Sequence, residues 1–167
     1  MQIRTALAIA FVVLLGVDTR AQRSTFGMNL RALTDAQADK MKELGATTAR
    51  VVFGWDTIEP NCKGCFNWTI TDAWRDEARR TGLAIFGTLA YSPRWANGGR
   101  TFNYPPLDYK DWYDFVYITV SRYKDDVFLW GVWNEPNLNT YLTDGDLRVY
   151  QTFVVTARAA IKAGNDG

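Results

Sequence analysis

The strongest constraint on the fold of this chain is a strand followed by a helix, repeated four times. Apolar strands are expected at residues 26–30, 47–55, 83–91 and 127–133. Helical patterns follow each of them, from Thr34 to about Gly45, from about Thr71 to Gly82, through residues 112–123 and over 147–161. Because nearly continuous apolar strands that alternate with helices are typical of parallel strands covered by helices, the sequence predicts an α/β fold.

Two architectures fit this pattern, an open doubly wound sheet and a (β/α)8 TIM barrel. The segment after the first strand, residues 28–32, has no glycine-rich phosphate loop, which disfavours the doubly wound sheet. Polar and aromatic residues gather directly after the strands, as they do in barrels: Trp55, Glu59, Tyr91, Trp95, Asn134 and Glu135.

Length limits how much of a barrel can be present. A complete barrel takes about 250 residues, and the chain has 167. Residues 162–167 look like a helix exit followed by turn residues, where a fifth strand would begin. We therefore expect residues 22–167 to form the front, N-terminal half of a barrel domain, with four βα units.

The first 21 residues have the pattern of a secretory signal peptide. Arg4 precedes an apolar stretch from Ala6 to Leu15, and small residues end with Ala21, after which we expect cleavage. A membrane anchor would need about 18 or more apolar residues, more than this segment supplies. The sequence therefore predicts a secreted or periplasmic protein, with no membrane attachment after cleavage.

Export affects the interpretation of the two cysteines, Cys62 and Cys65. In an oxidising compartment they could close a small disulfide loop or remain thiols. A redox-active pair would be expected in a strand-to-helix context that is missing here, so a local structural disulfide is favoured.

Composition narrows the chemistry that is available. The formal net charge is +1, which gives no reason to expect a nucleic-acid partner. The sequence contains no histidine, which excludes Ser-His-Asp and Cys-His catalysis and His-ligated zinc within this chain. Carboxylate chemistry remains, and we expect neither a metal nor an organic cofactor.

Glu135 is the leading candidate for such a carboxylate. The apolar run 128–133 ends in Asn134 and Glu135, and Pro136 stops the strand, so the carboxylate should lie where the chain leaves the sheet.

At this point the sequence resembles glycoside hydrolase clan A, above all families 39 and 5, which include β-xylosidases and cellulases. Residues 133–137, Trp-Asn-Glu-Pro-Asn, look like that clan's fourth-strand motif. Arg50 on the second strand, Trp55 with residues 58–60 after it, and residues 91–96 after the third strand agree with the resemblance.

The resemblance implies a glycosidase that acts on a poly- or oligosaccharide with retention of configuration. Glu135 would be the general acid/base, and Asn134 would bind the 2-hydroxyl of the sugar at the cleavage point. The nucleophile of the clan is a glutamate on a seventh strand, which this chain does not supply. We therefore expect the isolated chain to be inactive, and we give Glu59 only a minor chance of replacing that nucleophile.

Further side chains are candidates for substrate binding. Arg50 would support the floor of the site by analogy with the clan. Aromatic rings stack against the apolar face of sugars, although core packing is the commoner fate of a tryptophan. We expect about two of four rings to contact substrate: Trp55, Tyr91, Trp95 and Trp133.

A half-barrel would expose its sheet edges and its apolar interior, so we expect it to self-associate or to pair with the missing C-terminal half. The alternative function is a non-catalytic carbohydrate-binding or interaction protein built on a truncated barrel.

Overall fold

The computed structural model describes residues 26–143 and 146–166. The expected signal peptide, residues 1–21, lies outside the described residues. Four parallel strands form one sheet in the order β1-β2-β3-β4. They are β1 (Gly27–Asn29), β2 (Thr48–Gly54), β3 (Ala84–Ala90) and β4 (Val127–Val132). Strands that follow one another in sequence are neighbours in space, as in a barrel, and the α/β prediction with four βα units is confirmed.

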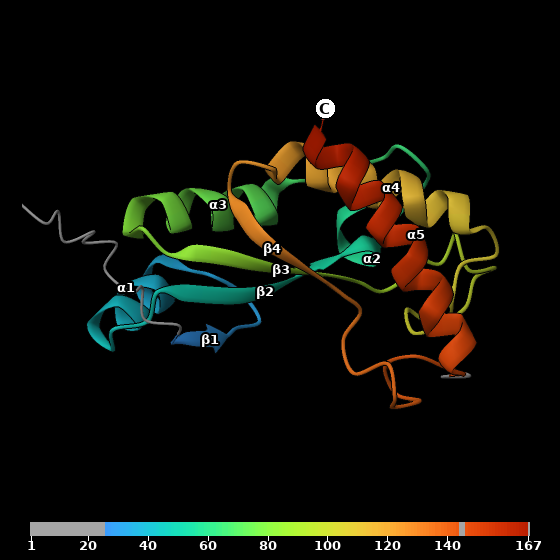
Figure 1. The fold of residues 1–167 in the computed structure, drawn as a ribbon, viewed down its shortest axis with the longest axis horizontal. Coiled ribbons are helices and arrows are strands. Elements are labelled where there is room, and N and C mark those ends of the chain that lie inside the picture. Colours follow the sequence, from blue (N-terminus) through green and yellow to red (C-terminus); the bar gives the residue numbers. More distant parts are fainter. Residues whose placement is uncertain (1–25, 144–145, 167) are drawn as a thin grey trace, which may run out of the picture.

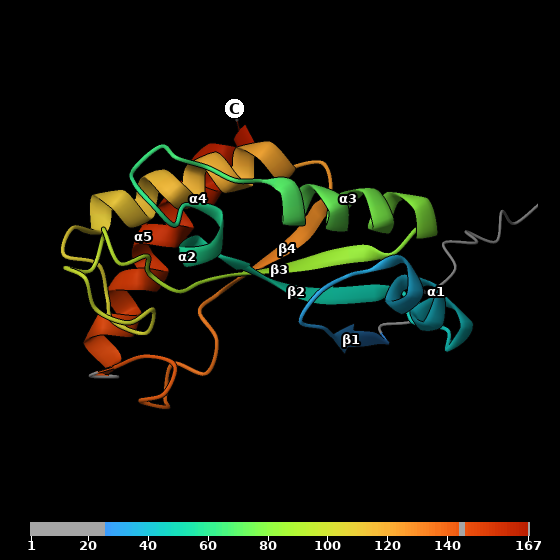
Figure 2. The ribbon, with the colours of Figure 1, turned by 180° about the vertical axis from the view of Figure 1, so that it is seen from behind.

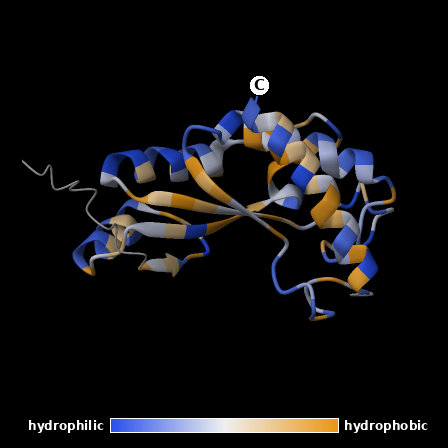
Figure 3. Ribbon diagram, in the orientation of Figure 1, coloured by the Kyte–Doolittle hydropathy of each residue, from blue (hydrophilic) through white to orange (hydrophobic). Residues whose placement is uncertain are grey.

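The helices are α1 (Asp35–Glu43), α2 (Trp55–Ile58), α3 (Thr69–Thr81), α4 (Tyr109–Tyr123) and α5 (Leu147–Asp166). Figures 1 and 2 show α3, α4 and α5 gathered on one side of the sheet. Figure 3 shows that β3 and β4, which they cover, are largely apolar. Among the described residues, no helix has the length and apolar character needed to cross a bilayer.

Local capping explains where two helices begin and end. The Thr34 side chain accepts a hydrogen bond from the Gln37 amide at 3.4 Å, and the Gln37 side chain accepts one from the Thr34 amide at 3.2 Å. This reciprocal pair is the capping box that the sequence predicted for α1. Gly82 ends α3 with a left-handed backbone, φ 70°, which glycine adopts without steric cost.

The second strand is shorter than the sequence predicted, because it ends at Gly54 and the short helix α2 begins at Trp55. The Asp56 side chain lies close to Gly54 at this turn. A Cβ atom built on Gly54 would lie 2.8 Å from the Asp56 carboxylate, so the carboxylate folds back over the glycine backbone.

Helix α5 continues to Asp166, so the expected helix exit at residues 162–167 was wrong. The reason lies in packing against α4. Gly164 is buried, and a Cβ atom there would approach Val120 at 3.0 Å and the Tyr117 carbonyl oxygen at 3.1 Å. The glycine allows close contact between two helices instead of ending one of them.

An aromatic core fills the space between the sheet and the helices. The ring of Trp112 lies 5.7 Å from that of Trp55 and 5.3 Å from that of Phe153, and the ring of Phe153 lies 4.3 Å from that of Trp133. Burial of each such side chain stabilises the fold by roughly 1.5–3 kcal/mol. The same rings hold the ends of β2 and β4, which carry the candidate site.

The opposite face of the sheet is open. A hollow of about 860 Å³ lies over β1 to β3 on this face, and its lining includes Thr48, Arg50, Phe86 and Phe128. Phe128 and Leu129 of β4 are exposed. In a closed barrel these inward positions would be covered by facing strands.

We expect Gly164→Ala to destabilise the protein by about 1–3 kcal/mol, because the added methyl group overpacks the α4–α5 contact. Helix propensity alone would favour alanine by about 1 kcal/mol. Chemical denaturation would measure the change. Ala159→Gly, on the exposed side of α5, measures separately how much helix propensity contributes to stability. A Gly164→Ala variant that is more stable than the unmodified protein would contradict the close packing.

Candidate active site

The candidate site is organised around Arg50, the third residue of β2, whose side chain lies on the open face of the sheet. Its Nη1 atom donates to Asn29 Oδ1 at 2.9 Å, and its Nη2 atom donates to Asn134 Oδ1 at 3.1 Å. Asn29 is the last residue of β1, and Asn134 follows β4. One guanidinium group therefore connects the two outer strands of the sheet across its concave face, and its charge also lies 5.7 Å from the centre of the Phe86 ring.

Asn134 is held from a second side by Tyr91, whose hydroxyl group hydrogen-bonds to its side chain. Burial raises the pKa of Tyr91, while the hydrogen bond to Asn134 and the charge of Arg50 oppose that rise. Because Asn134 Oδ1 accepts from Arg50, the amide Nδ2 is its donor side. The structure thus brings Arg50, Tyr91 and Asn134 together, as the sequence prediction requires.

The backbone is strained where the chain leaves β3 and β4. Three described residues other than glycine have positive φ: Tyr91 at 69°, Trp133 at 64° and Glu135 at 45°. Such left-handed conformations cost of order 1–3 kcal/mol each and cluster at functional sites. All three residues belong to the site predicted from the sequence.

Glu135 is exposed and begins the loop after β4. The preceding Trp133 anchors this turn, because its amide donates to the Leu89 carbonyl oxygen at 2.7 Å and its ring nitrogen donates to the Tyr141 carbonyl oxygen at 2.8 Å. In the described part of the chain, no ion pair or side-chain hydrogen bond restrains the Glu135 carboxylate. The side chain is available to solvent and to a ligand.

The four candidate aromatic residues have different environments. Trp55 is 0% exposed and Trp133 is 3% exposed, so neither ring has a face open to a sugar and the structure gives no support to direct stacking by them. Tyr91 and Trp95 are partly exposed. Trp95 is itself packed edge-on against Trp55, with ring centres 5.6 Å apart. Sugar contact by these residues stays a prediction.

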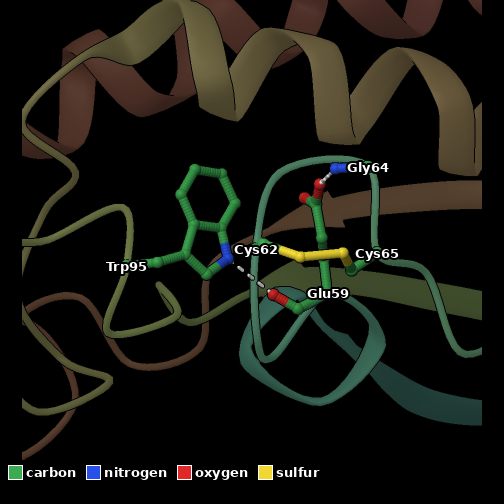
Figure 4. The surroundings of a disulfide bond; sticks show 5 residues. All are labelled: Glu59, Cys62, Gly64, Cys65 and Trp95. Atoms are coloured by element: carbon green, nitrogen blue, oxygen red, sulfur yellow. Dashed lines mark hydrogen bonds between the residues drawn. A yellow bond between two sulfur atoms is a disulfide. The ribbon is translucent and has the colours of Figure 1, made fainter.

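Cys62 and Cys65 form a disulfide, as favoured from the sequence. Figure 4 shows the loop that it closes beside Glu59 and Trp95. The Glu59 carboxylate accepts hydrogen bonds from the Gly64 amide and, at 2.6 Å, from the Trp55 ring nitrogen. The backbone carbonyl oxygen of Glu59 accepts a hydrogen bond from the Trp95 ring nitrogen at 2.7 Å.

Glu59 therefore has a structural role, because its oxygen atoms hold three neighbouring groups in place. It is 2% exposed, and burial raises its pKa, while the hydrogen bonds from Gly64 and Trp55 act against that rise. A carboxylate enclosed by the molecule's own donors cannot reach a substrate. The loop around it is also fixed to α4 by Lys63, which pairs with Asp111 at 2.6 Å and with Asp114 at 2.8 Å.

Asp56 is a site residue that the sequence reasoning missed. It is partly buried at the end of β2, and burial raises its pKa despite hydrogen bonds from the Thr57 hydroxyl and nearby backbone amides. Among the described residues it forms no ion pair. A partly buried carboxylate without a cation marks a candidate functional position. Its location after the second strand was a usable signal.

Within residues 26–143 and 146–166, no group of three or more His, Cys, Asp or Glu side chains is arranged to hold a metal ion. The chemistry that the described residues can perform is proton transfer and hydrogen bonding by carboxylate, amide and phenol groups.

Comparison with known proteins places this geometry in context. No model of a known protein family matches the chain. A β-xylosidase of Geobacillus stearothermophilus is 30% identical over 117 residues, which are 61% of this chain and 23% of that protein. This chain resembles the clan A glycosidases.

Solved structures agree with this similarity at the level of the fold. A monomeric β-xylosidase from Caulobacter crescentus superimposes with a TM-score of 0.65 at 22% identity, over 83% of this chain and 33% of that one. A family 39 glycoside hydrolase from Bacteroides cellulosilyticus gives a TM-score of 0.63 at 17% identity, over 84% and 29%. The resemblance to the clan and the barrel-type fold are confirmed.

The chain thus spans about a quarter of the curated relative's length, 23%, and about a third of the first solved structure's chain, 33%. It corresponds to part of a glycosidase-like barrel.

We expect Glu59→Ala to destabilise the fold by about 2–4 kcal/mol, because it leaves a cavity and removes the acceptor of the buried Trp55 ring nitrogen and of the Gly64 amide. Urea titration would measure the loss. Glu43→Ala is the matched control, since the Glu43 side chain is 65% exposed and its ion pair with Lys40 lies on the surface. Equal losses in both variants would rule out the structural role of Glu59.

We expect Asp56→Asn to raise the melting temperature at pH 7. The raised pKa of Asp56 means that the folded state disfavours the charged carboxylate. The charged carboxylate therefore lowers the free energy of unfolding above the folded pKa, and this effect vanishes below the unfolded pKa. The gain should therefore shrink as the pH falls through the acidic range. Calorimetry at several pH values measures this gain in melting temperature, and Asp125→Asn, at an exposed position, is the control. A gain that does not depend on pH would contradict the raised pKa of Asp56.

Proposed function

We propose that this chain carries the acid/base side of a glycosidase active site, which hydrolyses O-glycosidic bonds of a carbohydrate. The observation that carries the proposal is the pair Asn134–Glu135 at the end of β4, with Asn134 fixed by Arg50 at 3.1 Å and Glu135 exposed beside it. The similarity to glycosidases supports the same conclusion.

The chemistry requires an acid at this position. An alkoxide is a poor leaving group, so a carboxylic acid must protonate the glycosidic oxygen as the bond breaks. Glu135 would donate that proton and later take one from the attacking water. Asn134 Nδ2, held in direction by Arg50, would donate to a hydroxyl group of the sugar ring.

A mechanism with retention needs a second carboxylate about 5–5.5 Å from the acid. We propose that it is supplied by a later strand of a complete barrel, as the resemblance implies. The rest of that barrel, or a second copy of the chain, would cover the exposed inner face around Phe128 and Leu129.

We also propose that the protein is exported and works outside the cytoplasm. The disulfide between Cys62 and Cys65 supports this, because such bonds persist in oxidising compartments.

The test is hydrolysis, by the complete barrel that we propose, of a series of β-xylosides whose leaving groups differ in acidity. We expect Glu135→Gln to reduce kcat/KM by about 10²–10⁴-fold for alkyl xylosides, which depend on proton donation. The loss should be much smaller for nitrophenyl xylosides, whose leaving group needs little help from an acid.

Glu43→Gln, whose side chain on α1 is 65% exposed, is the control and should behave as the unmodified protein. An equal loss for all leaving groups would contradict the acid role. Sugar binding that depends on Asn134, without any hydrolysis, would favour the alternative of a carbohydrate-binding protein.

A further inference from the structure

Two hollows meet at Asp56 and Phe102, on the side of the candidate site formed by β2 and β3. One, of about 460 Å³, is lined among others by Arg31, Asp56, Tyr91 and Phe102. The other, of about 370 Å³, is lined among others by Asp56, Arg94 and Phe102. Both hollows are lined by Asp56 and Phe102, so they adjoin at these two residues, and we refer to the two together as the groove.

We propose that this groove, centred on Asp56 and Phe102, is a binding subsite for a further neutral pyranose unit of the substrate chain. The proposal rests on the proposed glycosidase function and adds to it that the substrate has at least two sugar units bound by this half of the barrel.

Phe102 presents an exposed aromatic ring whose position is fixed by its neighbours. Its side chain is 40% exposed, and its ring packs edge-on against Tyr91 with ring centres 4.9 Å apart. Its carbonyl oxygen accepts a hydrogen bond from the Ser92 amide at 2.8 Å. The loop is further braced by Asn97, whose side chain donates to the Thr101 carbonyl oxygen at 2.9 Å. An exposed ring on a fixed backbone offers the apolar face that a pyranose can cover at small entropic cost.

Asp56 supplies the hydrogen-bond acceptor. A carboxylate accepts hydrogen bonds and does not donate them, whereas sugar hydroxyl groups are donors. The Thr57 hydroxyl group donates only a long hydrogen bond to the Asp56 carboxylate, at 3.4 Å. Among the described residues, no cation forms an ion pair with Asp56. A sugar hydroxyl would therefore satisfy a partly buried charge that the protein leaves without a counterion.

The groove adjoins the candidate catalytic residues through Tyr91. Tyr91 lines the larger hollow, and its hydroxyl group hydrogen-bonds to Asn134, next to Glu135. A sugar over Phe102 would thus neighbour the sugar held by Asn134. Arg31 and Arg94 line the two hollows and add hydrogen-bond donors.

Calorimetric binding to the Glu135→Gln variant of the full chain tests the proposal, with methyl β-xyloside as a one-unit probe and xylotriose as a longer one. We expect Phe102→Ala to weaken xylotriose binding about two- to tenfold and to leave methyl β-xyloside unchanged. Asp56→Asn should weaken xylotriose binding about tenfold or more, and its stability can be checked by melting.

Matched controls lie away from the groove. Tyr117→Ala removes a ring of α4 that is exposed to 39%, close to the exposure of Phe102, and Asp125→Asn removes an exposed carboxylate. Neither should change the affinity for either probe.

The outcomes separate this proposal from the proposed function. If hydrolysis depends on Glu135 but the Phe102 and Asp56 variants weaken both probes equally, or weaken neither, the subsite is overturned and the glycosidase function stands. If neither probe binds and no xyloside is hydrolysed, both are overturned. A selective loss for xylotriose supports the subsite.

Discussion

The hydrogen bonds from Arg50 to Asn29 and Asn134 are the constraint on which the site depends. They connect the ends of β1 and β4, at 2.9 and 3.1 Å, across a sheet whose concave face has no helix to fix its curvature. A guanidinium group suits this task because its planar fork has donors in several directions and remains charged at all relevant pH values. Arg50 orients the Asn134 side chain, and the hydrogen bonds of Trp133 fix the turn from which Glu135 starts.

The aromatic layer on the other face makes this arrangement rigid. Trp55 and Trp133 are buried in the core, and each holds a loop of the candidate site in place. The Trp55 ring nitrogen donates a hydrogen bond of 2.6 Å to the Glu59 carboxylate. Glu59 in turn accepts hydrogen bonds from the disulfide loop and from Trp95, and so fixes both. Packing residues thus act on the site through the loops that they hold, which is how a barrel separates stability from chemistry.

Much of this fold could be predicted from the sequence, because the relevant signals are local. Strand patterning, the Thr34–Gln37 capping box and the closely spaced cysteines each express a short-range preference. The errors came where tertiary contacts decide. Gly164 resembles a helix end in sequence but serves a helix contact in space, and the turn at Gly54 gave no periodic signal. Asp56 was missed because its burial depends on the loop after β3, which is remote in sequence.

The backbone of Glu135, with φ at 45°, shows that folding does not explain this residue. Its side chain is exposed and contributes nothing to the core, while its left-handed conformation favours glycine. No core contact of the Glu135 side chain offsets this cost, in contrast to Trp133, whose buried ring contributes to the core. An exposed carboxylate held in a conformation that favours glycine fits the acid role that we propose for Glu135.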